Sequence, residues 1–317
     1  MPASASIEAV PAAPTVRPGR ARVWFQAVRF FSFTASAIPI LVGSSLAVVD
    51  RSFDPVLFLA MLIASVACHA GANLANDYFD HRKGIDTDES LGPSKVIQLG
   101  YLTPRQVVRG LLFAFSVATT LGLYIVYRSG WPILVLAVLS LIAAVLYTGG
   151  PKPLGYVALG ELTVFVFMGP VMVTGAYYVH TGVVSRSSVL VSVPIGLLAA
   201  AILHANNIRD IDLDREAGKQ TLANLLGRHA ANIEYAILVL GSYIAIVMVV
   251  LLDPRLWPLT IALVTIPTAA SLARTVFSKT GPLVLNGVLR RTAGLHLRVG
   301  GLMTIALLFR ASVDQLF

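Results

Sequence analysis

Acidic and amide side chains gather in two short segments of this sequence, residues 73–89 and 206–219, which together hold nine of the 16 acidic residues. In the first segment, Asn76 and Asp80 are four residues apart, and Asp77 is three residues before Asp80. In a helix, residues at these spacings lie on one face. Carboxylates held so close together repel each other, and a bound cation would remove that repulsion.

The second segment repeats this arrangement, because Asp210 and Asp214 are also four residues apart. The available ligands are oxygen atoms, with only the single His81 beside them, which favours Mg²⁺ over zinc. Mg²⁺ binds proteins through one or two carboxylates together with substrate phosphates. The two segments together predict magnesium–phosphate chemistry, although either one alone could be a solvated helix end.

Basic residues adjoin both segments. They are Arg82, Lys83 and Lys95 beside the first, and Arg209, Arg215 and Lys219 beside the second. Acids alone would indicate a cation path, whereas acids interleaved with bases indicate a metal-bridged anion, and a diphosphate fits best. Departure of diphosphate from an allylic carbon leaves negative charge, which Mg²⁺, Lys and Arg can neutralise. The remaining carbocation could be stabilised by aromatic faces such as those of Tyr78, Phe79 or Tyr147.

The composition places these segments in a membrane protein. Of the 317 residues, 56% are hydrophobic and 13% are charged, and the mean hydropathy is +0.77. A soluble domain carries about 25% charged residues, so this chain has too few to cover a soluble surface. The net charge of +8 does not indicate nucleic acid as a partner, because the basic residues lie in short loops between apolar stretches. The partner that this pattern indicates is the lipid bilayer.

Nine apolar stretches approach the roughly 20 residues that cross a bilayer core as a helix. They are residues 23–48, 55–78, 104–127, 131–148, 157–179, 187–207, 232–252, 255–276 and 294–316. We therefore predict an all-α integral membrane protein with about nine transmembrane helices. Residues 1–21, rich in alanine and proline, are predicted to form a disordered tail, and residues 22–317 a single membrane domain.

The basic residues also predict the orientation of the chain. With the N-terminus in the cytoplasm, 18 of the Lys and Arg residues lie on the cytoplasmic side and five lie outside, and Arg298 falls within the last span. An excess of Lys and Arg is typical of cytoplasmic loops. In this orientation both acidic segments open toward the cytoplasm.

The two acidic segments resemble the paired aspartate-rich motifs of the UbiA superfamily of intramembrane prenyltransferases. The matching patterns are Asn76-xxx-Asp80 and Asp210-xxx-Asp214. The commonest first motif has a further aspartate where this sequence has Gly84, with Asp86 following. That variant is similar to the branch of the superfamily that prenylates 1,4-dihydroxy-2-naphthoate.

Further segments, between about residue 25 and residue 310, resemble the same branch. They are Tyr147-Thr148-Gly149 with Pro153-Leu154, then Gly160-Glu161-Leu162, Gly169-Pro170 and the run 206–222. The resemblance implies a bundle of nine helices around a central cavity, capped by the two motif loops. It also implies a Mg²⁺ cofactor, a polyprenyl diphosphate donor, an aromatic acceptor and a place in the bacterial inner membrane.

The resemblance assigns roles to individual residues. The implied metal ligands are Asn76, Asp77, Asp80, Asp86, Asp210 and Asp214, of which Asp80, Asp210 and Asp214 are the candidate catalytic residues. The implied diphosphate contacts are Arg29, Asn73, Tyr147, Lys152, Arg209 and Lys219, with Asn73 also a candidate for a structural role. In this branch the ring carbon that bears the carboxylate is prenylated and CO₂ is lost.

Other functions remain open from the sequence. The same chemistry could serve another acceptor, such as 4-hydroxybenzoate, homogentisate, a chlorophyll or haem precursor, or a lipid alcohol. A membrane cation transporter would place its acids near the middle of the bilayer, whereas here they lie at predicted helix ends. A CDP-alcohol phosphotransferase is disfavoured because its Asp-Gly-x-x-Ala-Arg motif is absent from the sequence.

Overall fold

The computed structural model describes residues 18–83, 94–148, 153–216 and 218–316. The longer helices are α2 (Thr34–Val49), α3 (Pro55–Lys83), α4 (Pro104–Ser129), α5 (Trp131–Thr148), α8 (Arg186–Arg209), α11 (Arg228–Leu252), α12 (Ile266–Ser278) and α13 (Pro282–Leu316). The shorter ones are α1 (Arg20–Ala27), η1 (Phe30–Phe33), η2 (Leu154–Tyr156), α6 (Gly160–Val166), the π-helical η3 (Phe167–Val171), α7 (Met172–Thr181), α9 (Ile211–Glu216), α10 (Leu222–Leu226) and the 3₁₀-helical η4 (Pro254–Thr265).

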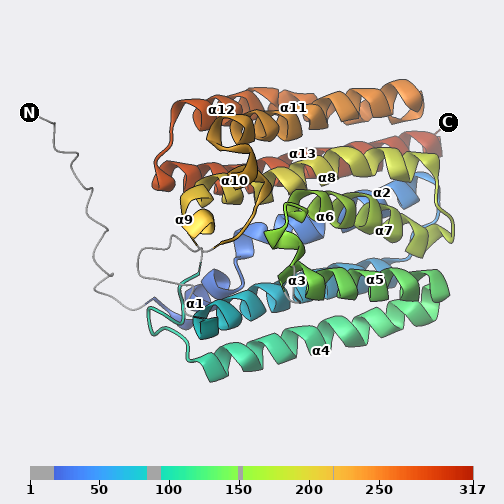
Figure 1. Ribbon diagram of the computed structural model, residues 1–317. Helices are drawn as coiled ribbons and strands as arrows, with labels where there is room; N and C mark the ends of the chain where they lie inside the picture. The colour runs from blue at the N-terminus through green and yellow to red at the C-terminus, as the bar shows by residue number, and fades with distance from the viewer. Residues whose placement is uncertain (1–17, 84–93, 149–152, 217, 317) are drawn as a thin grey trace, which may run out of the picture.

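The long helices lie side by side along one common direction, and α1, α9 and α10 lie at one end of the bundle, which we call the site end (Figure 1). Within the described residues, eight helical segments are long and apolar enough to cross a membrane, and Trp131–Ala144 is a shorter apolar helix. These nine segments correspond to the nine predicted spans, so the prediction of an all-α membrane bundle is confirmed. Residues 1–17 of the predicted tail lie outside the described residues, and α1 begins at Arg20.

The last helix is longer than predicted. The expected span began at residue 294, whereas α13 begins at Pro282. The apolar pattern is interrupted by Arg290 and Arg291, but arginine is a good helix former. The helix therefore continues through the two arginines into the apolar run at residues 282–289, which is too short to be recognised as a span of its own.

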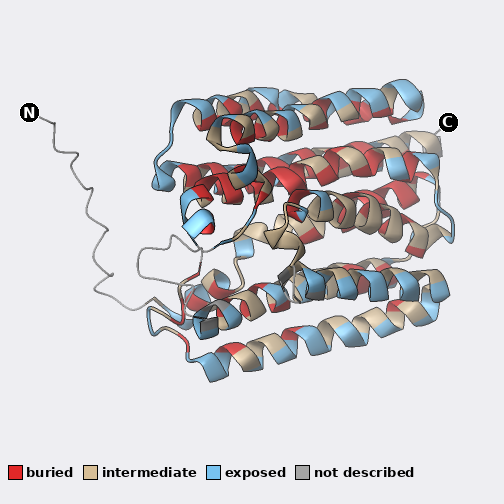
Figure 2. Ribbon diagram, in the orientation of Figure 1, coloured by how far each residue is buried: buried red, intermediate tan, exposed pale blue. Residues whose placement is uncertain are grey.

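The core of the bundle lies around α8. In the apolar part of α8, 72% of the residues are buried inside the protein, compared with 11% in α4. Figure 2 shows the same contrast, with buried residues concentrated in α8 and α13 and few in α4. The mainly exposed helices carry apolar side chains toward the surrounding lipid, whereas α8 positions the residues at its end from within the core.

Glycines allow the closest helix contacts. A Cβ atom on Gly169 in η3 would lie 2.7 Å from the Cα atom of Gly196 in α8, and one on Gly300 in α13 would lie 2.1 Å from Cγ2 of Ile38 in α2. Small residues at these points let helices approach closely, which is how helices associate within a bilayer. These contacts join η3 to α8 and α13 to α2 within the bundle.

Candidate active site

The second acidic segment begins where α8 ends. The Arg209 guanidinium donates from Nε and Nη2 to the two carboxylate oxygens of Asp210, at 2.7 and 2.6 Å. The same guanidinium donates to the side-chain oxygens of Asn206 and of Asn286 on α13, both at 3.0 Å. The Arg209 side chain is only 2% exposed. Arg209 therefore fixes Asp210 at the junction of α8, α9 and α13, and Asn286 is a site residue that the sequence analysis missed.

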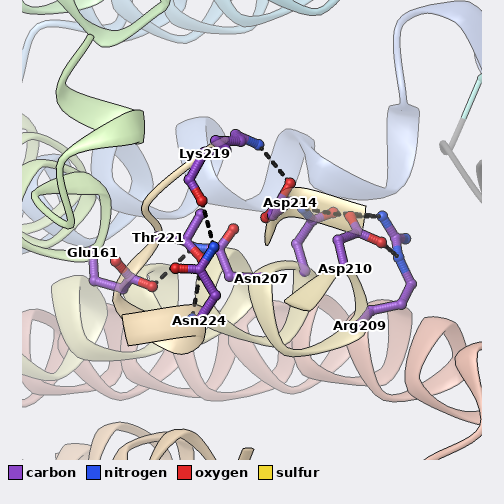
Figure 3. Close-up of polar contacts among 9 residues, drawn as sticks. Glu161, Asn207, Arg209, Asp210, Asp214, Lys219, Thr221 and Asn224 are labelled. Carbon is purple, nitrogen blue, oxygen red and sulfur yellow. Dashed lines mark hydrogen bonds and ion pairs between the residues drawn. The ribbon is translucent and has the colours of Figure 1, made fainter. Parts of the chain in front are cut away.

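Asp214 lies one turn further on, in α9. Lys219 Nζ lies 3.2 Å from Asp214 Oδ1, whereas Asp214 Oδ2 is buried and has no hydrogen-bond partner among the described residues (Figure 3). Burial raises the pKa of the Asp214 carboxyl above its ordinary value, and the Lys219 ammonium opposes that rise. A buried carboxylate oxygen without a partner is costly, and a cation at this position would remove the cost.

The chain after α9 is paired with the segment around η2. The backbone N–H of Ala158 donates to the Gln220 carbonyl at 2.8 Å, and the N–H of Gln220 donates to the Tyr156 carbonyl at 3.2 Å. Lys219 Nζ also lies 5.4 Å from the centre of the Tyr156 ring, within the range of a cation–π contact. Two segments more than 60 residues apart in the sequence thus meet beside Asp214.

Tyr147 belongs to the same neighbourhood. Its ring packs beside Gly155, and its hydroxyl oxygen is 3.4 Å from where a Cβ atom on Gly160 would lie. The tyrosine is within electrostatic reach of the carboxylates of Glu161 and Asp214. The structure therefore brings the predicted residues Tyr147, Asp214 and Lys219 together.

The first acidic segment lies at the end of α3. Asp77 is buried, and its Oδ1 atom accepts a hydrogen bond from Arg29 Nη2 at 2.7 Å. Its other oxygen accepts from the Ser94 hydroxyl, and the Ser94 carbonyl accepts from the Gln26 side chain at 2.6 Å. Arg29 has the left-handed backbone conformation, with φ 54°, which is uncommon for a residue other than glycine. Asp77 thus connects the end of α3 to Arg29, which lies between α1 and η1, and to Ser94 at the site end.

Asn73 supports the same corner. Its side-chain N–H group donates to the Val28 carbonyl at 2.8 Å, so this amide holds the backbone immediately before Arg29. This contact agrees with the structural role considered for Asn73. Asn76 is partly buried on the same helix, three residues further along α3.

Several predicted site residues are not described. Asp86 and Lys152 lie outside the described residues, as does the side chain of Asp80. Within the described part of the chain, no three His, Cys, Asp or Glu side chains converge closely enough to hold a metal ion. Of the predicted metal ligands in the second acidic segment, the structure describes both Asp210 and Asp214. The unpaired oxygen of Asp214 is the atom of this pair that could accept a cation.

A buried polar network extends from the site into the bundle. Glu161 Oε1 accepts a hydrogen bond from Asn207 Nδ2 at 2.9 Å (Figure 3). The same oxygen lies 2.9 Å from His204 Nδ1. The other His204 ring nitrogen lies 2.8 Å from the Ala231 carbonyl oxygen. Glu161 is the only acidic residue between residues 104 and 209. Acids within membrane helices pair with polar partners, so this isolation is the signal that could have identified the network.

Comparison with known proteins gives the relationships of the chain. Residues 36–282 match the model of the UbiA prenyltransferase family. The chain is 32% identical to the 1,4-dihydroxy-2-naphthoate octaprenyltransferase of Bacillus subtilis over 90% of this chain and 92% of the relative. It is 34% identical to the Escherichia coli protein of the same name, over 86% of this chain and 91% of that relative. The human UbiA prenyltransferase domain-containing protein 1 is 36% identical over 86% of this chain and 80% of its own length.

Solved structures show the same fold. A UbiA homolog from Archaeoglobus fulgidus bound to GPP and Mg²⁺ superposes with a TM-score of 0.60 at 12% identity, covering 89% of this chain and 99% of the homolog. A homolog from Aeropyrum pernix K1 superposes with a TM-score of 0.59 at 17% identity, covering 91% of this chain and 98% of the other. With the sequence matches over most of its length, this chain is a membrane prenyltransferase and belongs to the UbiA prenyltransferase family.

Proposed function

We propose that this enzyme transfers a polyprenyl group from a polyprenyl diphosphate to 1,4-dihydroxy-2-naphthoate, in a Mg²⁺-dependent reaction of menaquinone biosynthesis. The observation that carries the phosphate chemistry is the arrangement at Asp214, where one carboxylate oxygen is paired with Lys219 and the other is buried and unpaired. The acceptor is supported by the two bacterial relatives, both named 1,4-dihydroxy-2-naphthoate octaprenyltransferase.

The donor set fits Mg²⁺ and a diphosphate. Oxygen ligands suit Mg²⁺, which shares its coordination between carboxylates and substrate phosphates. The proposed core ligands are Asn76, Asp80, Asp210 and Asp214, supported by Asp77 and Asp86. The proposed diphosphate contacts are Arg29, Tyr147, Lys152, Arg209 and Lys219, with Asn73 holding the backbone before Arg29. When bound, Mg²⁺ would supply positive charge against the departing diphosphate.

The protein's own contribution is positioning and charge. Arg209, held by Asn206 and Asn286, keeps Asp210 in one orientation. Lys219 contributes a positive charge beside Asp214, and this charge can stabilise the negative charge that develops on the departing diphosphate. The C–O bond of the allylic diphosphate breaks, and the electron-rich ring of the acceptor forms the new C–C bond to the allylic carbon. In the proposed acceptor, loss of the carboxyl group as CO₂ would restore the aromatic ring.

We further propose that the site end faces the cytoplasm in the bacterial inner membrane. The excess of Lys and Arg in the loops on that side supports this orientation. Both substrates would then meet at this end: the soluble acceptor from the cytoplasm and the prenyl diphosphate with its head group at the membrane surface.

The test is a product assay on the purified protein in detergent. Geranylgeranyl diphosphate and longer polyprenyl diphosphates would be offered with equal concentrations of 1,4-dihydroxy-2-naphthoate, 4-hydroxybenzoate and homogentisate, and products identified by mass spectrometry. In Mg²⁺ we expect the prenylated naphthoquinol, together with the naphthoquinone that oxidation by air forms from it, and in excess EDTA we expect neither. Prenylation of another acceptor alone would overturn the acceptor and leave the donor chemistry intact. Equal product in EDTA would overturn the role of Mg²⁺.

A further inference from the structure

Arg298 is a charged residue inside the membrane part of α13. Its side chain is exposed, and no ion pair among the described residues involves it. The depth of Arg298 follows from two contacts between α13 and the α2 region. Arg290 stacks on Phe31, 5.6 Å from the ring centre, and Gly300 packs directly against Ile38. Arg298 therefore lies near the level of Ile38, eight residues, or about 12 Å, further from the site end than Arg290.

The face that carries Arg298 points toward lipid. Ile305, seven residues after Arg298 and on the same face of α13, is 61% exposed, and the adjacent Leu297 is 51% exposed. At the other end of the helix, Arg310 pairs with Asp314, about 18 Å beyond Arg298 along the axis. An unpaired arginine within the hydrocarbon layer is costly, and such residues mark functional positions in membrane proteins. The general excess of basic residues in loops does not explain an arginine placed this deep.

The part of the chain around Arg298 is rich in basic residues. From Arg255 to Val313, both included, the sequence contains seven basic residues and no aspartate or glutamate. Arg291, seven residues before Arg298, lies on the same face of the helix and donates to the Ser271 hydroxyl on α12 at 3.5 Å. Arg274 is three residues after Ser271 on α12 and is exposed. We call Arg274, Arg291 and Arg298 the α12–α13 basic surface, and none of the three forms an ion pair with an acidic side chain among the described residues.

The local geometry suits a lipid phosphate. Side chains on a helix lean toward its N-terminus, and α13 begins at the site end, so the Arg298 guanidinium reaches back toward Arg291. Gly294 lies between them with no side chain, and a Cβ atom there would meet nothing within 4 Å. No side chain of Gly294 therefore separates Arg291 from Arg298 on this face of the helix. The phosphate group of a lipid can contact both arginines there, while the acyl chains of the lipid lie along Leu297 and Ile305.

We propose that the α12–α13 basic surface binds an anionic glycerophospholipid of the bilayer, such as phosphatidylglycerol, through its phosphate group. Arg298 draws the phosphate below the usual headgroup level, and Arg291 and Arg274 contact it from the surface side. This lipid site is separate from the aspartate site, because α13 contributes Asn286 there from a position three turns before Arg298.

The test is lipid binding by the full-length protein in detergent, measured by native mass spectrometry with phosphatidylglycerol in competition with phosphatidylcholine. We expect the wild type to retain phosphatidylglycerol preferentially. Arg298→Leu should weaken that binding about fivefold, the effect of about 1 kcal/mol for one arginine near an anionic headgroup, whereas Arg298→Lys should stay within about twofold. The matched control is Arg109→Leu, since Arg109 is an exposed arginine on α4 without an ion pair among the described residues.

Melting temperatures without added lipid would verify that each variant is folded. Phosphatidylglycerol should raise the melting temperature of the wild type and of Arg109→Leu by several degrees, and Arg298→Leu and Arg298→Gln should lose this rise. Unchanged phosphatidylglycerol binding in Arg298→Leu, or an equal loss in Arg109→Leu, would overturn the proposal. Displacement of the bound lipid, mole for mole, by geranylgeranyl diphosphate would assign the surface to the prenyl donor and equally overturn it.

Discussion

Lys219 Nζ lies 3.2 Å from Asp214 Oδ1, and the second oxygen of the same carboxylate is buried without a partner among the described residues. The Lys219 ammonium is therefore a positive charge next to a carboxylate that has one oxygen, Asp214 Oδ2, still able to bind a cation. We predict that Lys219→Met raises KM for the polyprenyl diphosphate by at least about tenfold, because a hydrogen bond to a charged group is lost. Steady-state kinetics with the prenyl donor varied would measure this. Lys279→Met, at an exposed lysine after α12, should leave KM unchanged, and equal effects of the two changes would contradict the assignment.

We predict that substitutions of Arg29 and Asp77 have non-additive effects on the stability of the protein. Both side chains are largely buried, with 20% and 7% exposed, and removing one partner leaves an uncompensated charge. Arg29→Ala and Asp77→Ala should each lower the melting temperature in detergent, and the double variant should be little worse than either one. The exposed pair Arg228–Asp212 is the control, because such pairs contribute little. Fully additive losses at Arg29 and Asp77 would show that the pair does not hold this corner.

Close packing at Gly169 gives a prediction about the helix bundle. A Cβ atom there would lie 2.7 Å from Gly196 Cα, whereas one on Gly175, in the same membrane-spanning segment, would lie 3.8 Å from its nearest neighbour, Leu136. We expect Gly169→Ala to lower the melting temperature by several degrees or prevent folding, since overpacking costs about 1–3 kcal/mol. Gly175→Ala should be neutral. If both variants melted like the wild type, the contact between η3 and α8 would be looser than described.

Asp253, between α11 and η4, gives a prediction about pH. Hydrogen bonds from the Arg255 guanidinium lower the pKa of Asp253 below its ordinary value, and a hydrogen bond from the Ser187 hydroxyl lowers it further. Burial of the carboxyl opposes this shift. A lowered folded-state pKa adds stability above the unfolded-state pKa of about 3.9, and this stability is lost as the pH falls through the folded-state pKa. Asp253→Asn should therefore melt below the wild type at pH 7, and the gap should shrink below about pH 4. A gap independent of pH would contradict this account.

Much of the fold could be predicted from the sequence, because a lipid-facing helix must be apolar over about 20 residues. The nine apolar stretches correspond to nine helical segments. The first turns of α13 escaped prediction because Arg290 and Arg291 separate their short apolar run from the longer apolar stretch that follows. The contact between Gly300 and Ile38 was equally hidden, since the sequence does not show which helices are neighbours.

The candidate site was predictable where its residues are close in the sequence. The spacing of Asp210 and Asp214 predicted that their carboxylates lie near each other, as the structure shows, and Lys219 follows five residues after Asp214. Their role as metal ligands stays a prediction. Asn286 was missed because it reaches Arg209 from α13, 77 residues later in the chain. The spacing in the first segment also could not show that both oxygens of Asp77 bond to Arg29 and Ser94. Such pairings depend on tertiary contacts.

The central claim is that the unpaired oxygen of Asp214 forms part of the catalytic site, and two residues of α9 allow a matched test. Asp214 is buried, whereas Asp212 is 75% exposed and pairs only with Arg228 among the described residues. The measurement is the rate at which the prenylated naphthoquinol forms at saturating Mg²⁺ and substrates, counted together with the naphthoquinone that oxidation by air forms from it. Asp214→Asn should lower this rate by at least about 100-fold, as expected when charge stabilisation in a transition state is lost, and Asp212→Asn should keep it within about twofold of the wild type. A wild-type rate in Asp214→Asn would contradict the account directly.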